Sequence, residues 1–237
     1  MTLGKNIGLM INTKKKPKLM KVQTRKGESV TIGGEELEEV EQFTYLGSVI
    51  RKTVGTYEDI NARICKARQA FAMLKPVSKS NVLSENTKVR IFNTNVKSVL
   101  FYGCETWRLT AGLQYKIQVF INKCLRHICK VWWPRKITNK QLLDRTNQDP
   151  AETHIKKRAW QWIGHTWRKP QNSITREALD WNPQGQRKRG RPSHSWKRTR
   201  MKELDNIGKT WGEAKKTAQN RERATVVALY STRSEED

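Results

Sequence analysis

The amino-acid sequence predicts a mainly α protein of the α+β type, with a short N-terminal β-hairpin region, a helical bundle and a basic C-terminal helical region. Up to Ile50 the apolar residues fall in short runs separated by turn residues, a pattern typical of strands and hairpins. After Gly55 they recur at helical spacing between residues that cap and end helices. Beyond residue 133 basic residues and tryptophans become frequent. We therefore expect three parts, residues 1–55, 56–133 and 134–237.

The first part should contain several short strands. Turn residues at Lys26-Gly27 and Gly33-Gly34 allow the chain to reverse between apolar runs. Negative charge dominates locally only in residues 35–41, which we expect to form an exposed hairpin edge. The apolar runs are residues 9–11, 19–22 and 30–32, followed by Phe43, Tyr45 and Leu46.

The helical part begins with an apolar stripe from Ile60 to Leu74, which Pro76 ends. Ser84 is a suitable N-cap for a second helix that runs to Gly103. The helices up to residue 133 should pack as a bundle. Further stripes predict helices over residues 113–128, 150–167, 196–204 and 213–229.

The charge of the chain indicates a polyanionic partner. It has 47 Lys+Arg against 22 Asp+Glu, a formal net charge of +25, and nucleic acid is the usual partner of such a chain. A membrane is not expected, because no apolar run approaches the roughly 20 residues that span a bilayer. No signal peptide is recognisable, so we expect an intracellular protein. The basic cluster at residues 14–18 suits nuclear import and equally a solvated loop.

Residues 184–200 are the most basic stretch, with seven Lys/Arg and no carboxylate. Within it, Arg189-Gly190-Arg191-Pro192 resembles an AT-hook, in which glycine lets the backbone approach the minor-groove floor while both arginines reach sideways. A solvated basic linker, an import signal and a general phosphate-binding strap are the alternatives. Further phosphate contacts are expected from Arg187, Lys188, Lys197 and Arg198.

Several tryptophans stand beside basic residues, including Trp132-Trp133-Pro134-Arg135-Lys136. Aromatic rings among cations suit single-stranded nucleic acid, whose bases stack on them. The alternative is that each ring belongs to the core, and Trp162 falls on the apolar stripe of its helix. Trp160 and Trp167 share a neighbouring face, and we expect them to be exposed and to contact bases.

Cys124, His127 and Cys129 suggest a zinc site, with His154 or His165 as a fourth ligand. On a helix, however, Cys124 and His127 share one face while Cys129 points elsewhere, and no paired CxxC occurs. We therefore interpret the cysteines as reduced thiols, buried in helices, and expect no metal and no cofactor in this chain.

Short motifs follow one another in a particular order along most of the chain, and together they resemble the later part of a non-LTR (LINE-type) retrotransposon reverse transcriptase, most closely the RTE-type endonuclease-reverse transcriptases. The motifs are Gly8-Leu9-Met10-Ile11-Asn12, Phe43-Thr44-Tyr45-Leu46-Gly47-Ser48, Leu100-Phe101-Tyr102-Gly103-Cys104-Glu105-Thr106-Trp107, Asn122-Lys123-Cys124-Leu125-Arg126, Ile137-Thr138-Asn139, Trp160-Gln161-Trp162-Ile163-Gly164-His165, Ala178-Leu179-Asp180-Trp181 and Arg189-Gly190-Arg191-Pro192-Ser193.

The resemblance implies roles for each part of the chain. Residues 8–18 would end the palm, residues 57–133 would form a thumb-like bundle, and the region beyond Pro134 would bind RNA and DNA. Phe43, Tyr45, Leu46 and Gly47 would belong to the primer-grip hairpin that holds the growing DNA end. The paired aspartates that hold Mg²⁺ in this family belong upstream of residue 1, so Mg²⁺ is expected only there. The polymerase and endonuclease domains expected upstream are candidate partners.

The predicted function is therefore the non-catalytic, nucleic-acid-binding portion of a retrotransposon RNA-directed DNA polymerase. The chain has no adjacent Asp-Asp, no glycine-rich phosphate loop after a strand and no recognisable nucleophile, so we expect it to be inactive alone. Two alternatives stay open: an independent AT-hook-like DNA-binding or chromatin protein, and a non-functional remnant of an element.

Overall fold

The computed structural model describes residues 17–21, 30–32, 35–52, 56–180 and 195–220. The chain divides into two compact units, Met1–Asp59 and Ile60–Asp237, which are considered separately. The described residues are mainly α-helical with a few short strands, as predicted. No described helix has both the length and the apolarity that crossing a membrane requires.

The first unit contains three short strand pairs. Antiparallel pairing joins β2 (Thr31–Ile32) to β3 (Glu35–Glu36), and β5 (Gln42–Tyr45) to β6 (Ser48–Arg51), so both are hairpins of the expected kind. β1 (Lys18–Leu19) pairs in parallel with β4 (Glu38–Glu39), which the sequence did not predict. The predicted acidic edge is exposed at Glu38 and Glu39, and Glu39 pairs with Lys21 and Lys52 at 3.1 and 3.0 Å.

The second unit contains α2 (Tyr57–Met73) from Ile60 onward, and Ile60, Ile64 and Ala67 are fully or almost fully buried. Their spacing places them on one face, as the apolar stripe predicted. Pro76 follows α2 at the expected place and lies in the first turn of α3 (Lys75–Lys79), where proline is tolerated because the first N–H groups of a helix have no partner within it.

The second predicted helix is present but interrupted. Ser84 caps α4 (Glu85–Phe92) by accepting a hydrogen bond from the N–H of Thr87. The chain then passes through a π-helical segment, η1 (Asn93–Lys97), and α5 (Ser98–Leu100), and ends at Gly103 with φ 74°. A π-helical turn places an extra residue in the helix, and such turns often occur at functional sites.

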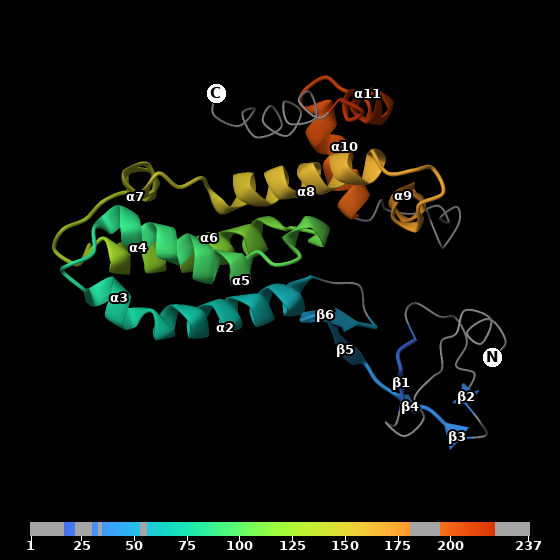
Figure 1. Ribbon diagram of the computed structural model, residues 1–237, viewed down its shortest axis with the longest axis horizontal. Coiled ribbons are helices and arrows are strands. Elements are labelled where there is room, and N and C mark those ends of the chain that lie inside the picture. The colour runs from blue at the N-terminus through green and yellow to red at the C-terminus, as the bar shows by residue number, and fades with distance from the viewer. Residues whose placement is uncertain (1–16, 22–29, 33–34, 53–55, 181–194, 221–237) are drawn as a thin grey trace. The chain divides into compact units, whose positions relative to one another are not determined.

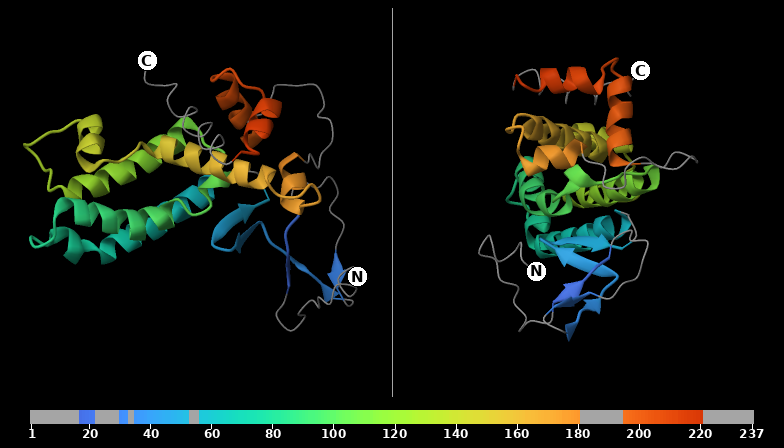
Figure 2. Two further views of the ribbon diagram at one scale, coloured as in Figure 1. Left: turned by 45° about the horizontal axis from the view of Figure 1, so that its top comes forward. Right: turned by 90° about the vertical axis from the view of Figure 1, so that its right-hand side faces the viewer.

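α6 (Ala111–Ile128) and α8 (Ala151–Trp167) are the long helices of the main core. Between them lies α7 (Asn139–Thr146), a short helix that the apolar pattern did not predict. Figures 1 and 2 show α2, then α4 with α6, and then α8 as successive layers of this unit. One buried cluster extends from Ile60 to Ile155 and includes Leu142 of α7.

A second buried cluster joins the C-terminal half of α8 to α9 (Ile174–Asp180), α10 (Trp196–Asp205) and α11 (Trp211–Thr217). It is built largely from tryptophan rings: the centroids of Trp167 and Trp211 lie 4.9 Å apart, and those of Trp162 and Trp196 lie 6.0 Å apart. The predicted helix over 196–204 is confirmed as α10. Of the predicted helix over 213–229, residues 213–217 lie in α11, but the helix ends at Thr217 and residues 218–220 form a turn; residues 221–229 lie outside the described residues.

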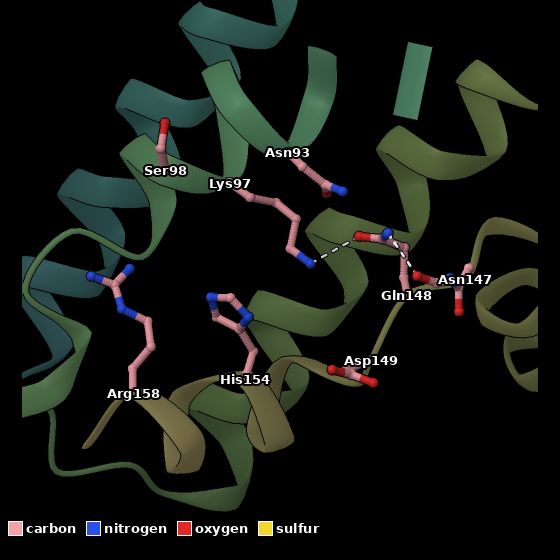
Figure 3. A pocket seen from close by; sticks show the side chains of 8 residues that line it. All are labelled: Asn93, Lys97, Ser98, Asn147, Gln148, Asp149, His154 and Arg158. Carbon is pink, nitrogen blue, oxygen red and sulfur yellow. Dashed lines mark hydrogen bonds between the residues drawn. The ribbon is translucent and has the colours of Figure 1, made fainter. Parts of the chain in front are cut away.

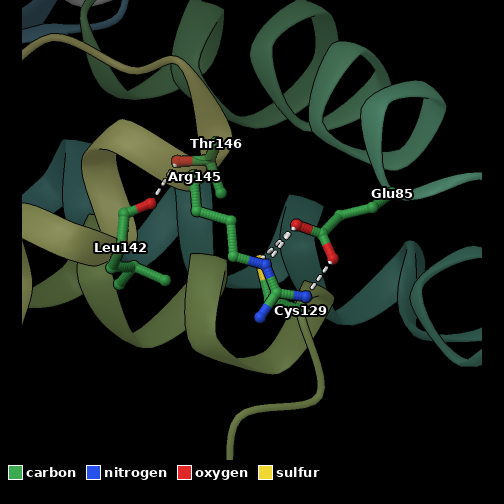
Figure 4. Close-up of polar contacts among 5 residues, drawn as sticks. All are labelled: Glu85, Cys129, Leu142, Arg145 and Thr146. Carbon is green, nitrogen blue, oxygen red and sulfur yellow. Dashed lines mark hydrogen bonds and ion pairs between the residues drawn. The ribbon is translucent and has the colours of Figure 1, made fainter. Parts of the chain in front are cut away.

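A cluster of polar side chains joins the start of α4, the end of α6 and α7 (Figure 4). Glu85, the first residue of α4, accepts hydrogen bonds from Nε and Nη2 of Arg145 of α7 at 2.9 and 2.6 Å. The thiol of Cys129, just after α6, donates to the same carboxylate at 3.3 Å. The hydrogen bonds from Arg145 hold the pKa of Glu85 below its usual value, so the carboxylate is ionised at neutral pH.

Candidate nucleic-acid interface

The end of α6 reverses the chain and leads it out of the core. The N–H of Val131 donates to the carbonyl of Arg126 at 3.0 Å, and the N–H of Lys130 donates to that of His127 at 3.4 Å. Lys130 has a left-handed φ of 52°. These two hydrogen bonds and the left-handed residue make a Schellman motif, in which glycine is the usual residue at the position of Lys130. Val131 is buried, and the chain emerges directly after it.

The other end of this segment is held by α7. Ile137 packs against the main core, and Thr138 and Gln141 form a capping box at the start of the helix. Arg126 of α6 reaches across and donates through Nη2 to Oδ1 of Asn139 at 2.7 Å. Residues 132–136, here called the tryptophan loop, are therefore a short segment attached to the core at both ends.

The tryptophan loop exposes two adjacent indole rings. Trp132 is 57% and Trp133 82% exposed, and Arg135 and Lys136 beside them are exposed as well. Large aromatic side chains usually gain by burial, so an exposed adjacent pair is informative, whereas a single exposed apolar residue is ordinary. Exposed rings next to cations are the arrangement on which unpaired bases stack while the phosphates meet the positive charge.

The imidazole of His127 packs between two aromatic rings, one of which belongs to the tryptophan loop. Its ring packs edge-on against Trp132, with centroids 5.5 Å apart, and edge-on against Phe71, with centroids 5.6 Å apart. Cys124 and Cys129 are buried, as expected for thiols that belong to the core. Among the residues that the structure describes, no three His, Cys, Asp or Glu side chains are grouped so as to hold a metal ion.

The prediction that Trp160 and Trp167 are exposed is wrong. They are only 4% and 1% exposed, and their rings pack in the second cluster. The reason is that α8 is covered both by the main core and by α10 and α11, so its buried surface is wider than one apolar stripe. Neither ring can stack on a base in the folded protein.

The basic C-terminal stretch is described only in part. Arg187, Lys188, Arg189, Gly190, Arg191 and Pro192 lie outside the described residues, and the AT-hook hypothesis stays a prediction. Arg198 is exposed on α10. Lys197 pairs with Asp180 at 3.1 Å and lies over the Trp211 ring, while Arg200 is 2% exposed and pairs with Glu203 at 2.9 Å. Arg200 therefore belongs to the core and is not a phosphate contact.

The hairpin that the resemblance equates with a primer grip is present in the first unit. Leu46 and Gly47 connect β5 and β6 with φ values of 49° and 84°, as in the two-residue turns that match the twist of a hairpin. Phe43 and Tyr45 lie on one face with ring centroids 6.4 Å apart, and Phe43, Tyr45 and Leu46 are 44%, 58% and 72% exposed. The hairpin therefore presents apolar side chains to solvent.

Comparison with known proteins places the chain in the context of transposons. A family model described as a domain of unknown function (DUF6451) matches residues 70–102, from the C-terminal end of α2 through α5. A putative uncharacterized transposon-derived protein of Caenorhabditis elegans is 24% identical over 211 residues, covering 84% of this chain and 74% of the relative. No solved structure matches. The similarity supports a transposon-related origin for this chain.

Proposed function

We propose that this chain is a nucleic-acid-binding portion of a LINE-type retrotransposon RNA-directed DNA polymerase, and that its tryptophan loop binds single-stranded RNA or DNA. The observation that carries the proposal is the exposed pair Trp132 and Trp133, held beside Arg135 and Lys136 by a loop with two anchored ends. The transposon-derived relative and the order of the sequence motifs support the context, and the net charge of +25 supports the ligand class.

The geometry favours single strands over duplexes. In a duplex the faces of the bases are stacked on one another, whereas in a single strand they are available to Trp132 and Trp133. Stacking of one base on an aromatic side chain contributes about 1 to 3 kcal/mol. The loop is short and attached to the core at both ends, so its backbone loses little conformational entropy when a strand binds.

The exposed β5–β6 hairpin supports the remaining part of the proposal, a primer-grip role. Leu46 occupies a left-handed position that glycine or asparagine adopts at lower cost, and it is 72% exposed at the tip. An exposed apolar side chain at the tip of a hairpin is suited to contact with a ligand. In this proposal the hairpin contacts the primer end, the tryptophan loop contacts unpaired template, and both act in the nucleus.

The test is binding of the full chain to a fluorescein-labelled single-stranded RNA, measured by anisotropy at fixed salt. Trp133→Ala should weaken binding about fivefold to 150-fold, as loss of one stacked base implies. Tyr115→Ala is the matched control, because Tyr115 is an aromatic residue 73% exposed on α6, away from the loop. Equal affinities for the wild type and Trp133→Ala would refute the proposal.

A further inference from the structure

A polar cavity of about 380 Å³ lies between the π-helical segment η1 and the start of α8. Asn93 and Lys97 reach it from η1, Gln148 from the connection that follows α7, and His154 and Arg158 from α8 (Figure 3). Its rim includes the exposed residues Ser98, Asn147 and Asp149, so the cavity is open to solvent. The volume is in the range of small-molecule sites, which is roughly 300 to 1,000 Å³.

Phe101 organises the basic side chains of this cavity. The ammonium of Lys97 lies over its ring, 5.8 Å from the centroid. The imidazole of His154 packs on the same ring, with centroids 4.4 Å apart, and Arg158 donates through Nη1 to its backbone carbonyl at 3.1 Å. Three nitrogen-bearing side chains from separate turns are therefore held around one buried residue.

The cavity has a surplus of hydrogen-bond donors. Lys97 is 8% exposed and donates to Oε1 of Gln148 at 3.0 Å, which uses one of the three hydrogens of its ammonium group. Burial lowers the pKa of Lys97, and burial together with the neighbouring cations Lys97 and Arg158 lowers the pKa of His154 to about 4. At neutral pH the imidazole is therefore uncharged, with one N–H to donate. The charge of Arg158 is partly balanced by Glu105 at 2.6 Å.

The side chain of Asn93 has hydrogen-bonding capacity that the described residues leave unused. Its side-chain oxygen is buried and has no hydrogen-bond partner among the described residues. The oxygen and nitrogen of an amide exchange places by a simple flip, so the same side chain can offer an N–H to a bound acceptor. A buried cation with unused donors and an unsatisfied amide face the same space.

We propose that this cavity binds a phosphate group of a nucleic-acid strand. Tetrahedral phosphate oxygens accept several hydrogen bonds at once and bring negative charge to the ammonium of Lys97, whose nearby carboxylate, Asp149, lies exposed at the rim of the cavity. Lys97, Asn93 and His154 supply donors from different directions, and Arg158 adds a second positive charge at the entrance. That the ligand is a phosphate group follows from the donors and charges of the cavity. That this phosphate belongs to a nucleic-acid strand rests on the proposed function.

Inorganic phosphate is the probe for the cavity, titrated at constant ionic strength into the isotope-labelled full chain while ¹H–¹⁵N shifts are recorded. Saturable shifts are expected at the amides of Lys97, Gln148 and His154. Asn93→Asp is nearly isosteric and places a negative charge in the cavity, so it should weaken phosphate binding at least about tenfold, the equivalent of one hydrogen bond to a charged group. Asn86→Asp adds the same charge at an exposed position of α4 and should change the affinity less than twofold.

Two further variants keep the test decisive. Lys97→Met removes the cation but keeps an apolar stem over Phe101, and Lys123→Met removes a cation from an exposed position of α6. Only the first should abolish the saturable shifts. Equal effects of Asn93→Asp and Asn86→Asp, or of the two lysine variants, would show general electrostatic attraction and overturn the proposal. Absence of saturable shifts around the cavity in the wild type would overturn it as well.

Single-stranded DNA with a 5′-phosphate or a 5′-hydroxyl distinguishes the sources of the phosphate. If Asn93→Asp weakens only the phosphorylated strand, the cavity takes a strand end; if it weakens both, the cavity takes an internal phosphodiester. An unchanged affinity for both strands would refute a nucleic-acid ligand. Trp133→Ala should leave the inorganic phosphate titration unchanged, so failure of the cavity and failure of the tryptophan loop give different results.

Discussion

The indole Nε1 of Trp160 donates a hydrogen bond of 2.9 Å to Oε2 of Glu203, the carboxylate that also pairs with Arg200 at 2.9 Å. All three side chains are buried, and they join α8 to α10. Each hydrogen bond to a buried carboxylate offsets part of the cost of removing that charge from water. The ring of Trp160 therefore has a structural role, while the exposed Trp133 is available for binding.

Replacing the hydrogen-bond donor of Trp160 should destabilise the protein. Trp160→Phe keeps most of the apolar volume but removes the indole N–H, leaving Glu203 with one partner fewer, and should lower the free energy of unfolding by about 1 to 3 kcal/mol. Trp133→Phe should change it by less than about 0.5 kcal/mol, as expected of a surface substitution. Urea denaturation followed by far-ultraviolet circular dichroism measures both. Equal stabilities of the two variants would contradict this assignment.

The ion pair of Glu85 with Arg145 should make stability depend on pH in the acid range. Because the hydrogen bonds from Arg145 lower the pKa of Glu85 in the folded state, its contribution is fully present above the unfolded-state value, about 4.3, and is lost as pH falls through the folded-state pKa. Glu85→Gln should therefore be less stable than the wild type at neutral pH, and the difference should shrink below pH 4.

Thermal unfolding of both proteins between pH 3 and pH 7 checks this prediction. Asp144→Asn is the control, because Asp144 is exposed on α7 beside Arg145. A wild-type advantage over Glu85→Gln that is the same at pH 3 and pH 7 would show that ionisation of Glu85 does not carry the effect.

The left-handed residue Lys130, two positions before the tryptophan loop, gives a substitution that should stabilise the protein. Lys130 has φ 52°, a conformation that costs a side-chain-bearing residue about 1 to 2 kcal/mol and glycine almost nothing. Lys130→Gly should raise the free energy of unfolding by about 0.5 to 1 kcal/mol, after the greater chain entropy of glycine and the lost bond to Asn81 are counted. Lys123→Gly, in the middle of α6, should instead lower it by about 1 kcal/mol. A destabilised Lys130→Gly would argue against the Schellman geometry.

The long helices were predictable from the sequence because their apolar residues repeat at helical spacing and their ends carry strong signals, such as Ser84 and Gly103. α7 was missed because it is short and buries few apolar side chains. Its capping box, Thr138 with Gln141, was the available signal. The parallel pairing of β1 with β4 depends on residues about twenty positions apart in the sequence, and no local pattern encodes it.

For the tryptophan loop, the sequence predicts which residue types stand together but not whether they are exposed. The sequence shows that Trp132 and Trp133 stand beside basic residues, but exposure depends on the Schellman motif and the α7 cap that hold the loop away from the core. Trp160 and Trp167 were predicted to be exposed because the helical pattern of α8 shows one apolar stripe. The additional packing of α10 and α11 against α8, which buries both rings, is not visible in that pattern. The cavity of Lys97, Gln148 and His154 is formed by tertiary packing of separate elements, and no local sequence pattern predicts it.

The most direct test of the account is the position at which a bound strand contacts the chain. A single-stranded RNA carrying 5-iodouridine, irradiated in complex with the full chain, forms crosslinks to aromatic residues in contact with its bases. Trypsin cleaves after Lys130 and Arg135, so the expected product is the peptide of residues 131–135 joined to a nucleotide, detected by mass spectrometry. Crosslinking to that peptide at substantial yield is the predicted result, and crosslinks confined to other peptides would contradict the central claim.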